Sequence, residues 1–370
     1  MFRRTPRDVP SNLPHLTRIA RRASRAVRVA VTRVVTRAVT RAVILAVALA
    51  ACASPDGASS DGASSDGASP DQSAQTAPTP STDSTTAGWL PSQSWSARAV
   101  DTLDDFGAVL PRDASHAVRV VSLNPAFTEI VFAIGAGAGL VGRTQWDDRP
   151  AAALAVPNMG AGIRPNVEAV LATRPTLVLL YATAENRAAA DAFARAGVRT
   201  IALRTITIND FRRASHVLGM ALGQSAAAAA LTDSIDITLT RVRDAVRDVQ
   251  RPRVVWPSWD APVLVVGNAS YEAELLDIAG ATNVFADRDE SVANVTIEEI
   301  AKRDPSLLIA GPQRALLMRA SAPWNAVRAV REGRVFDLDT TVVGRPGVTI
   351  GMAAVSIARL LHPDRADRLP

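Results

Sequence analysis

Residues 224–250 read QSAAAAALTDSIDITLTRVRDAVRDVQ, and this stretch decides the fold. Its apolar residues recur at steps of three and four, which places them on one face of an α-helix. These residues are Leu231, Ile235, Leu239, Val242, Val246 and Val249. No Gly or Pro interrupts the stretch, and Arg251-Pro252 ends it, because a residue before proline is disfavoured in helical conformation. The sequence therefore predicts one long amphipathic helix.

The blocks on either side of this helix, residues 97–223 and 251–370, share an internal pattern. Residues 166–180 (NVEAVLATRPTLVLL) and 294–310 (NVTIEEIAKRDPSLLIA) each contain Asn-Val, a glutamate in the first helical turn, a proline and an apolar strand. Strands that alternate with helices are typical of parallel sheets. We therefore predict two parallel-sheet α/β lobes joined by a backbone helix at residues 224–250.

Apolar runs and turn residues predict the elements of each lobe. A short hairpin is expected at residues 100–110, and Thr128 is expected to cap a helix that ends at Gly135. The other expected strands are 118–123, 140–143, 199–203, 253–256, 306–310 and 334–338. The other expected helices are 184–196, 209–222, 271–279, 324–331 and 347–361.

The N-terminal region reads as an export signal followed by a tether. Residues 42–51 (AVILAVALAA) follow a run of arginines and are too short to span a bilayer. They end at Cys52, the single cysteine, in a setting that resembles a bacterial lipobox. We interpret residues 1–52 as a lipoprotein signal peptide; an ordinary secretory signal is the alternative. Residues 53–96 are dominated by Ser, Ala, Asp, Gly, Thr and Pro, a composition typical of a disordered tether.

The charge distribution gives no reason to expect a nucleic-acid partner. Eleven arginines and one acidic residue fall within residues 1–41, so the remainder of the chain carries 30 basic and 35 acidic residues. The basic excess therefore belongs to the predicted signal and not to the lobes.

Five segments together carry a family resemblance. They are residues 119–142 (RVVSLNPAFTEIVFAIGAGAGLVG), 144–150 (TQWDDRP), 167–180, 267–285 (GNASYEAELLDIAGATNVF) and 297–312. The chain is similar to the helical-backbone substrate-binding proteins of ABC importers, the receptors for cobalamin, ferric siderophores and haem, and the cobalamin-binding branch looks closest. The resemblance implies a class III periplasmic-binding-protein architecture, with the ligand in a cleft between the lobes. It also implies one docking glutamate on each lobe, Glu168 and Glu298, with Glu299 as an alternative to Glu298.

Ligands of open α/β sheets bind at the carboxyl ends of the strands. Residues at such positions are our ligand-binding candidates: Asn124, Phe127, Trp146, Tyr181, Trp256, Trp259 and Arg345. Trp146 matches a position that is aromatic in the cobalamin-binding branch. Aromatic side chains suit stacking on a large flat ligand, although Trp256 and Trp259 would also suit a core. The Arg345 guanidinium suits a ligand carboxylate or phosphate.

The chain lacks the sequence signs of a metal centre or of catalysis. Its four histidines show no ligand spacing, so we predict no metal site in the protein itself. No G-x-S-x-G or H-E-x-x-H motif occurs, so we expect a receptor and not an enzyme. The predicted partners are an ABC permease with its ATPase, a small-molecule ligand, and the membrane outside the cytoplasm through lipidated Cys52; we expect a monomer. An α/β enzyme or a surface interaction protein on the same scaffold is the alternative class.

Overall fold

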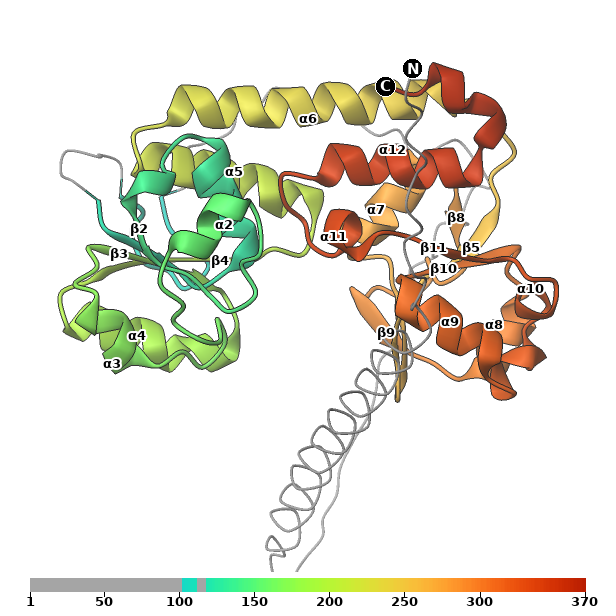
Figure 1. Ribbon diagram of the computed structural model, residues 1–370, viewed down its shortest axis with the longest axis horizontal. Helices are drawn as coiled ribbons and strands as arrows, with labels where there is room; N and C mark the ends of the chain where they lie inside the picture. Colours follow the sequence, from blue (N-terminus) through green and yellow to red (C-terminus); the bar gives the residue numbers. More distant parts are fainter. Residues whose placement is uncertain (1–101, 112–117) are drawn as a thin grey trace, which may run out of the picture. The chain divides into compact units, whose positions relative to one another are not determined.

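The computed structural model describes residues 102–111 and 118–370, which belong to one compact unit. The predicted signal peptide and tether lie outside the described residues. Figure 1 shows two α/β lobes and a long helix, α6 (Ser225–Ala245), that runs from one lobe to the other. The fold is α/β with parallel sheets, as the sequence predicts.

The N-terminal lobe is built on a four-stranded parallel sheet with the order β2-β1-β3-β4. Its strands are β1 (Val120–Ser122), β2 (Leu140–Gly142), β3 (Leu177–Tyr181) and β4 (Arg199–Leu203). Its helices are α2 (Pro125–Ala133), α3 (Val167–Ala172) and α4 (Arg187–Arg195), with short 3₁₀ turns η2 (Gly137–Gly139), η3 (Ala151–Ala155) and η4 (Ala184–Asn186). The strands are almost entirely buried, which explains their continuous apolar sequences.

The C-terminal lobe repeats this topology. Its parallel strands are β5 (Arg253–Val255), β8 (Thr282–Asn283), β10 (Leu307–Ala310) and β11 (Val335–Asp337), in the order β8-β5-β10-β11. We number the strands of each parallel sheet from one to four in chain order. In both lobes the second of these strands lies at one edge of the sheet, and the first, third and fourth follow it across the sheet. The intervening helices are α7 (Tyr271–Ile278), α8 (Ile297–Arg303), α9 (Pro312–Ala320) and α10 (Arg328–Arg331), with 3₁₀ turn η5 (Pro323–Ala326) before α10.

A second, antiparallel sheet distinguishes the C-terminal lobe and was not expected from the sequence. It consists of β6 (Pro257–Asp260), β7 (Val263–Val266) and β9 (Val292–Asn294), with β7 in the centre. β6 and β7 form a tight hairpin, whereas β9 is recruited from a distant part of the chain. Such long-range pairing leaves no local periodicity to detect.

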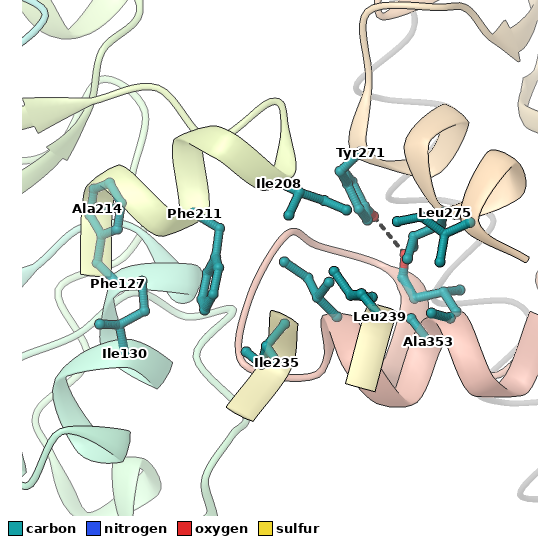
Figure 2. Close-up of a cluster of buried hydrophobic side chains, with 14 of the residues drawn as sticks. Phe127, Ile130, Ile208, Phe211, Ala214, Ile235, Leu239, Tyr271, Leu275 and Ala353 are labelled. Atoms are coloured by element: carbon teal, nitrogen blue, oxygen red, sulfur yellow. Dashed lines mark hydrogen bonds between the residues drawn. The ribbon is translucent and has the colours of Figure 1, made fainter. Parts of the chain in front are cut away.

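The hydrophobic core is continuous between the lobes. Helix α5 (Ile208–Ala221) and helix α12 (Ile350–Leu361) both pack on α6. The largest buried cluster combines side chains of α2, α5, α6, α7 and α12, and Figure 2 shows members such as Phe211, Ile235, Leu239 and Leu275 in it. The lobes are therefore joined by packed apolar surface as well as by the chain. The remaining helical segments are α11 (Thr340–Val343) and the 3₁₀ turn η6 (Pro363–Arg368).

Two glycines let α5 and α12 approach α6 closely. A Cβ atom on Gly219 would lie 2.5 Å from the Cβ atom of Ala228, and one on Gly351 would lie 3.2 Å from Cγ2 of Thr238. Both neighbours are on α6. The absence of side chains at these positions therefore sets the spacing of the three helices.

Several predicted helix boundaries are wrong, and two of the differences have a clear physical cause. The backbone helix ends at Ala245 and not at Gln250, because Val246 leaves helical geometry to pack, almost fully buried, against Gly280. The first helix begins at Pro125, where proline fits the first helical position, and its cap is Asn124 and not Thr128. Thr128 is instead fully buried within α2.

Candidate ligand site and docking surface

The loop after β2 presents Trp146 to solvent on a fixed support. The neighbouring Asp147 is fully buried, and its carboxylate accepts hydrogen bonds from the hydroxyls of Thr128 and Thr144. Burial raises the pKa of Asp147, and these hydrogen bonds oppose that change by favouring the charged form. With its neighbour anchored in this way, Trp146 remains 64% exposed.

Arg345 connects this loop to the C-terminal lobe. It lies between α11 and α12, and its Nη2 is 3.0 Å from Oδ1 of Asp148. Its Nη1 donates to the carbonyl oxygen of Trp146 at 3.4 Å and lies 3.6 Å from Oε1 of Glu129. All three partners belong to the N-terminal lobe, so Arg345 forms a charged contact between the lobes.

Glu129 is a buried carboxylate at the centre of this charge cluster. Its side chain on α2 is 2% exposed, and Arg149 donates to its Oε1 at 3.0 Å in addition to the contact with Arg345. Burial raises the pKa of Glu129, while the two guanidinium groups oppose that change. Gly347 lies so close that a Cβ atom there would be 2.6 Å from Oε2 of Glu129. The cluster therefore depends on a glycine in the segment that carries Arg345.

Tyr181 lies at the carboxyl end of β3, near the same cluster. Its side chain is half-buried, and burial raises the pKa of its hydroxyl; the charge of Arg345 opposes that change and the charge of Asp147 adds to it. The structure thus brings together three of the predicted site residues: Trp146, Tyr181 and Arg345.

Three other predicted ligand residues lie in the interior. Asn124 is fully buried, and its side-chain oxygen accepts from the amide of Ala126 at 2.9 Å as the cap of α2. Phe127 is fully buried in the core cluster, and Trp256 is almost fully buried in the same cluster. A position at a strand end does not determine where a side chain points. We therefore leave these three residues out of the proposed ligand contacts.

Trp259 is more exposed than Phe336, the other exposed aromatic residue of the C-terminal lobe. It lies on β6, is 56% exposed, and its Nε1 donates to the carbonyl oxygen of Ala261 at 3.1 Å. The Arg314 guanidinium from α9 lies 5.7 Å from the ring centre and pairs with Asp260 at 2.9 Å.

Sequence reasoning missed three charged residues beside the predicted ones. Glu129 had a usable signal, because a charged residue on the apolar face of a predicted helix needs a partner. Arg149 and Arg314 had none, since α9 was not predicted and the ion pairs depend on tertiary structure.

The two predicted docking glutamates occupy matched positions. Glu168 stands two residues after Asn166, the N-cap of α3, and Glu298 stands two residues after Thr296, the N-cap of α8. Both glutamates are exposed, and neither has an ion pair within the described part of the chain. The pKa of Glu298 is lowered by hydrogen bonds from its own backbone amide and from Thr296.

Glu299 is already engaged within its lobe. Its Oε1 lies 2.8 Å from Arg288 and 3.1 Å from Arg303. A carboxylate held by two guanidinium groups is less available to a second protein than an unpaired one. Glu298 is therefore more accessible to a partner protein than Glu299.

Comparison with known proteins identifies the family of the chain. The family model described as periplasmic binding protein matches residues 120–342. The chain belongs to the periplasmic binding protein family.

Similar proteins extend this assignment. This periplasmic binding protein is 28% identical over 257 residues to an uncharacterised ABC transporter substrate-binding lipoprotein, YvrC, of Bacillus subtilis, with 66% of this chain and 80% of the relative covered. Among solved structures, the vitamin B12-binding protein BtuF of Vibrio cholerae matches with a TM-score of 0.59 at 20% identity, covering 66% of this chain and 96% of BtuF. The heme-binding protein RhuT from Roseiflexus sp. RS-1 matches with a TM-score of 0.59 at 22% identity, covering 69% and 100%.

These matches confirm the class III periplasmic-binding-protein fold predicted from the sequence, and the chain is an ABC-transporter substrate-binding protein. Within the described residues no helix has the length and apolar character needed to cross a bilayer. No group of three or more metal-ligating side chains occurs among residues 102–111 and 118–370.

Proposed function

We propose that this periplasmic binding protein captures a large metal chelate between its lobes and delivers it to the permease of an ABC importer. The ligand proposed first is a cobalamin-like corrinoid. The observation that carries the proposal is the exposure of Trp146 on a loop fixed by the buried Asp147. A rigid, solvated indole beside an arginine suits stacking on a flat ligand with polar edges.

Trp259 supports a second stacking surface on the other lobe. Its indole is exposed, and its ring is accompanied by Arg314. One exposed tryptophan from each lobe is an arrangement that suits a ligand with two broad faces. This arrangement favours a macrocyclic chelate over a small ion or amino acid.

Ferric siderophores and haem are the alternative ligands. Tyr181 is one side chain that could ligate haem iron, and burial raises the pKa of its hydroxyl in the ligand-free protein. Tyr271 is nearly fully buried and its hydroxyl donates to the carbonyl oxygen of Val343 at 2.6 Å, as drawn in Figure 2. The engagement of the Tyr271 hydroxyl favours a ligand that brings a metal already fully coordinated.

The proposed role is that of a monomeric, non-enzymatic receptor. In support, the two adjacent carboxylates in the loop after β2, which could be imagined as an acid and a base, have different contacts. Asp147 is buried and held by two hydroxyls, while Asp148 pairs with Arg345. Neither arrangement resembles a pair of carboxylates that flank a shared substrate.

We further propose that lipidated Cys52 anchors the mature chain outside the cytoplasm, with residues 53–96 as a tether of about 35 Å r.m.s. span. The resemblance of the sequence before Cys52 to a lipobox supports this, as does the lipoprotein name of the Bacillus subtilis relative. Replacing Cys52→Ser should move the protein from the membrane to the soluble fraction and abolish labelling with a fatty-acid probe. A variant that stays membrane-bound would contradict the anchor.

The test of ligand binding is tryptophan fluorescence of the full-length protein, titrated with cyanocobalamin, ferric siderophores and haem, with correction for light absorbed by the ligand. We expect saturable quenching by one ligand at submicromolar concentration. Trp146→Ala should weaken that affinity by at least about tenfold, because a buried aromatic anchor contributes 2 kcal/mol or more.

A matched control is Met352→Ala, which removes an exposed apolar side chain from α12 and should leave the affinity unchanged. Absence of saturation with every ligand would remove the proposed ligand class. Quenching that persists unchanged in Trp146→Ala would remove this residue from the site.

A further inference from the structure

The contacts of Arg345 differ in their exposure to water. The Glu129 side chain is 2% exposed, whereas the Asp148 side chain, on the other side of the same guanidinium, is 60% exposed. Arg345 itself is 23% exposed. One partner is therefore fixed inside the protein, and the other faces solvent.

The two partners have different roles because of this difference. Glu129 is held in place by Arg149 and by the close approach of Gly347, so it can orient Arg345 without moving. An ion pair with a mobile, solvated carboxylate contributes little to stability and exchanges readily. Asp148 is thus the partner that an incoming anion can replace.

We propose that Arg345 is an anion subsite for a carboxylate or phosphate group of the ligand, and that Asp148 occupies this subsite in the ligand-free protein. This inference rests on the proposed function. A planar guanidinium binds the oxygens of either group in a fork geometry, so the ligand oxygen takes the place of Oδ1 of Asp148. Glu129 and the Trp146 carbonyl keep the guanidinium oriented during the exchange.

The position of the subsite indicates where the anionic group lies on the ligand. Arg345 donates to the carbonyl oxygen of Trp146, the residue proposed to stack on the ring. A ligand ring stacked on that indole therefore lies near Arg345, which a peripheral acid group of the ring can then reach. The receptor prefers flat ligands with an acid group at the edge over analogues in which that group is missing or esterified.

Asp148 sharpens this preference by acting as a competitor. A ligand that lacks an anion does not replace the Asp148 carboxylate and gains nothing from Arg345. A ligand that carries one exchanges one ion pair for another, and gains only if its oxygens fit the guanidinium better. Removing the Asp148 charge should strengthen the binding of acid-bearing ligands selectively.

The experiment compares paired probes on the full-length protein. The pairs are haem with haem dimethyl ester, and cyanocobalamin, which carries a phosphodiester, with dicyanocobinamide, which lacks it. We expect Asp148→Asn to raise the affinity for the acid-bearing member of the pair that binds by about threefold, and to leave its acid-free partner within about twofold. Arg345→Gln should lower the affinity for the acid-bearing member by about tenfold or more.

A matched control pair is Arg251 and Asp277, an exposed ion pair at 2.6 Å outside the proposed site. Arg251→Gln and Asp277→Asn should leave all affinities unchanged. Combining Asp148→Asn with Arg345→Gln should give the affinity of Arg345→Gln alone, since a competitor has no effect once the subsite is gone.

The outcomes separate this inference from the proposed function. If the site variants change the affinities of acid-bearing and acid-free probes equally, the subsite is overturned, while receptor function stands. If the probes bind and Asp148→Asn weakens the acid-bearing member, Asp148 is a ligand contact and not a competitor. If no probe binds the unmodified protein, corrinoids and haem both fail as ligands, and the subsite inference fails with them.

Discussion

Arg119 and Arg253 occupy the same place in the two lobes. Nη2 of Arg119 donates to the carbonyl oxygen of Thr173 at 2.7 Å, and Nη2 of Arg253 donates to that of Arg303 at 2.7 Å. Arg119 directly precedes β1, Arg253 is the first residue of β5, and each accepting carbonyl lies at the C-terminal end of α3 or α8. The two lobes therefore fix these helices to their sheets with the same contact.

The equivalence predicts that the glutamates on α3 and α8 act together. Changing Glu168→Arg with Glu298→Arg should abolish ligand uptake by cells that express the cognate transporter, because each glutamate is proposed to meet an arginine of the permease. Both side chains are exposed at helix N-termini, so the ligand affinity of the purified double variant should stay the same.

Asp233→Arg is the control for this experiment, because it reverses an exposed charge on α6. It should leave both uptake and affinity intact. Normal uptake by the double variant would show that the glutamates do not dock. Lost affinity would show that the change disturbs the lobes instead.

The packing of α5 on α6 predicts a difference between two glycine substitutions. Gly219→Ala places a Cβ atom 2.5 Å from that of Ala228, so the helices must separate; the free energy of unfolding should fall by about 1–2 kcal/mol. Gly351→Ala meets only Thr238 at 3.2 Å and gains helix propensity, so its effect should be within about 0.5 kcal/mol. Urea unfolding with circular dichroism measures both. Equal losses would show that the α12 contact is as rigid as the α5 contact.

Glu272 on α7 predicts a pH dependence of stability. Burial raises its pKa from 4.5 to about 7. The folded protein thus holds this proton more tightly than the unfolded chain, and its contribution to stability is complete below pH 4.5 and is lost as the pH rises through 7. Glu272→Gln should remove this loss and raise the free energy of unfolding at pH 8 by about 2–3 kcal/mol.

The measurement is the difference in unfolding free energy between Glu272→Gln and the unmodified protein from pH 4 to 8. Subtraction cancels the titration of other buried carboxylates such as Glu129 and Asp147, whose pKa values are also raised. A difference that does not change with pH would mean that Glu272 ionises normally in the folded protein.

The buried hydroxyl of Tyr271 predicts a local stability effect. Tyr271→Phe leaves the carbonyl oxygen of Val343 without this hydrogen-bond donor, and should lower the free energy of unfolding by about 1–2 kcal/mol. Because Val343 closely precedes Arg345 in the chain, hydrogen exchange should also increase in the segment between α11 and α12. Exchange that increases only within α7 would contradict this link.

Much of the fold could be predicted because its signals are local. The periodicity of residues 224–250 predicts α6, and the apolar runs predict the parallel strands. The Asn-Val pairs that the two similar segments share are not structural equivalents, because Asn166 is the N-cap of α3 whereas Asn294 lies in β9. The structural equivalents are the N-caps Asn166 and Thr296, which place Glu168 and Glu298 in register.

The rest depended on contacts that sequence patterns do not record. Phe127 and Trp256 follow strands as Trp146 does, yet they point into the core, because side-chain direction is set by the surrounding packing. The pairing of Arg345 with Asp148 joins residues that are distant in the chain. A sequence supplies the charges of such a pair but not their proximity.

The apolar cluster shared by the lobes has a consequence for how cargo leaves the receptor. Pulling the lobes apart exposes side chains such as Leu239 and Ile235 to water, and the free-energy cost grows with the apolar area exposed. Spontaneous wide separation of the lobes is therefore rare, which would help the proposed receptor to retain a ligand held between them. For the proposed receptor function, the free energy of wide opening would then have to come from interaction with the transporter.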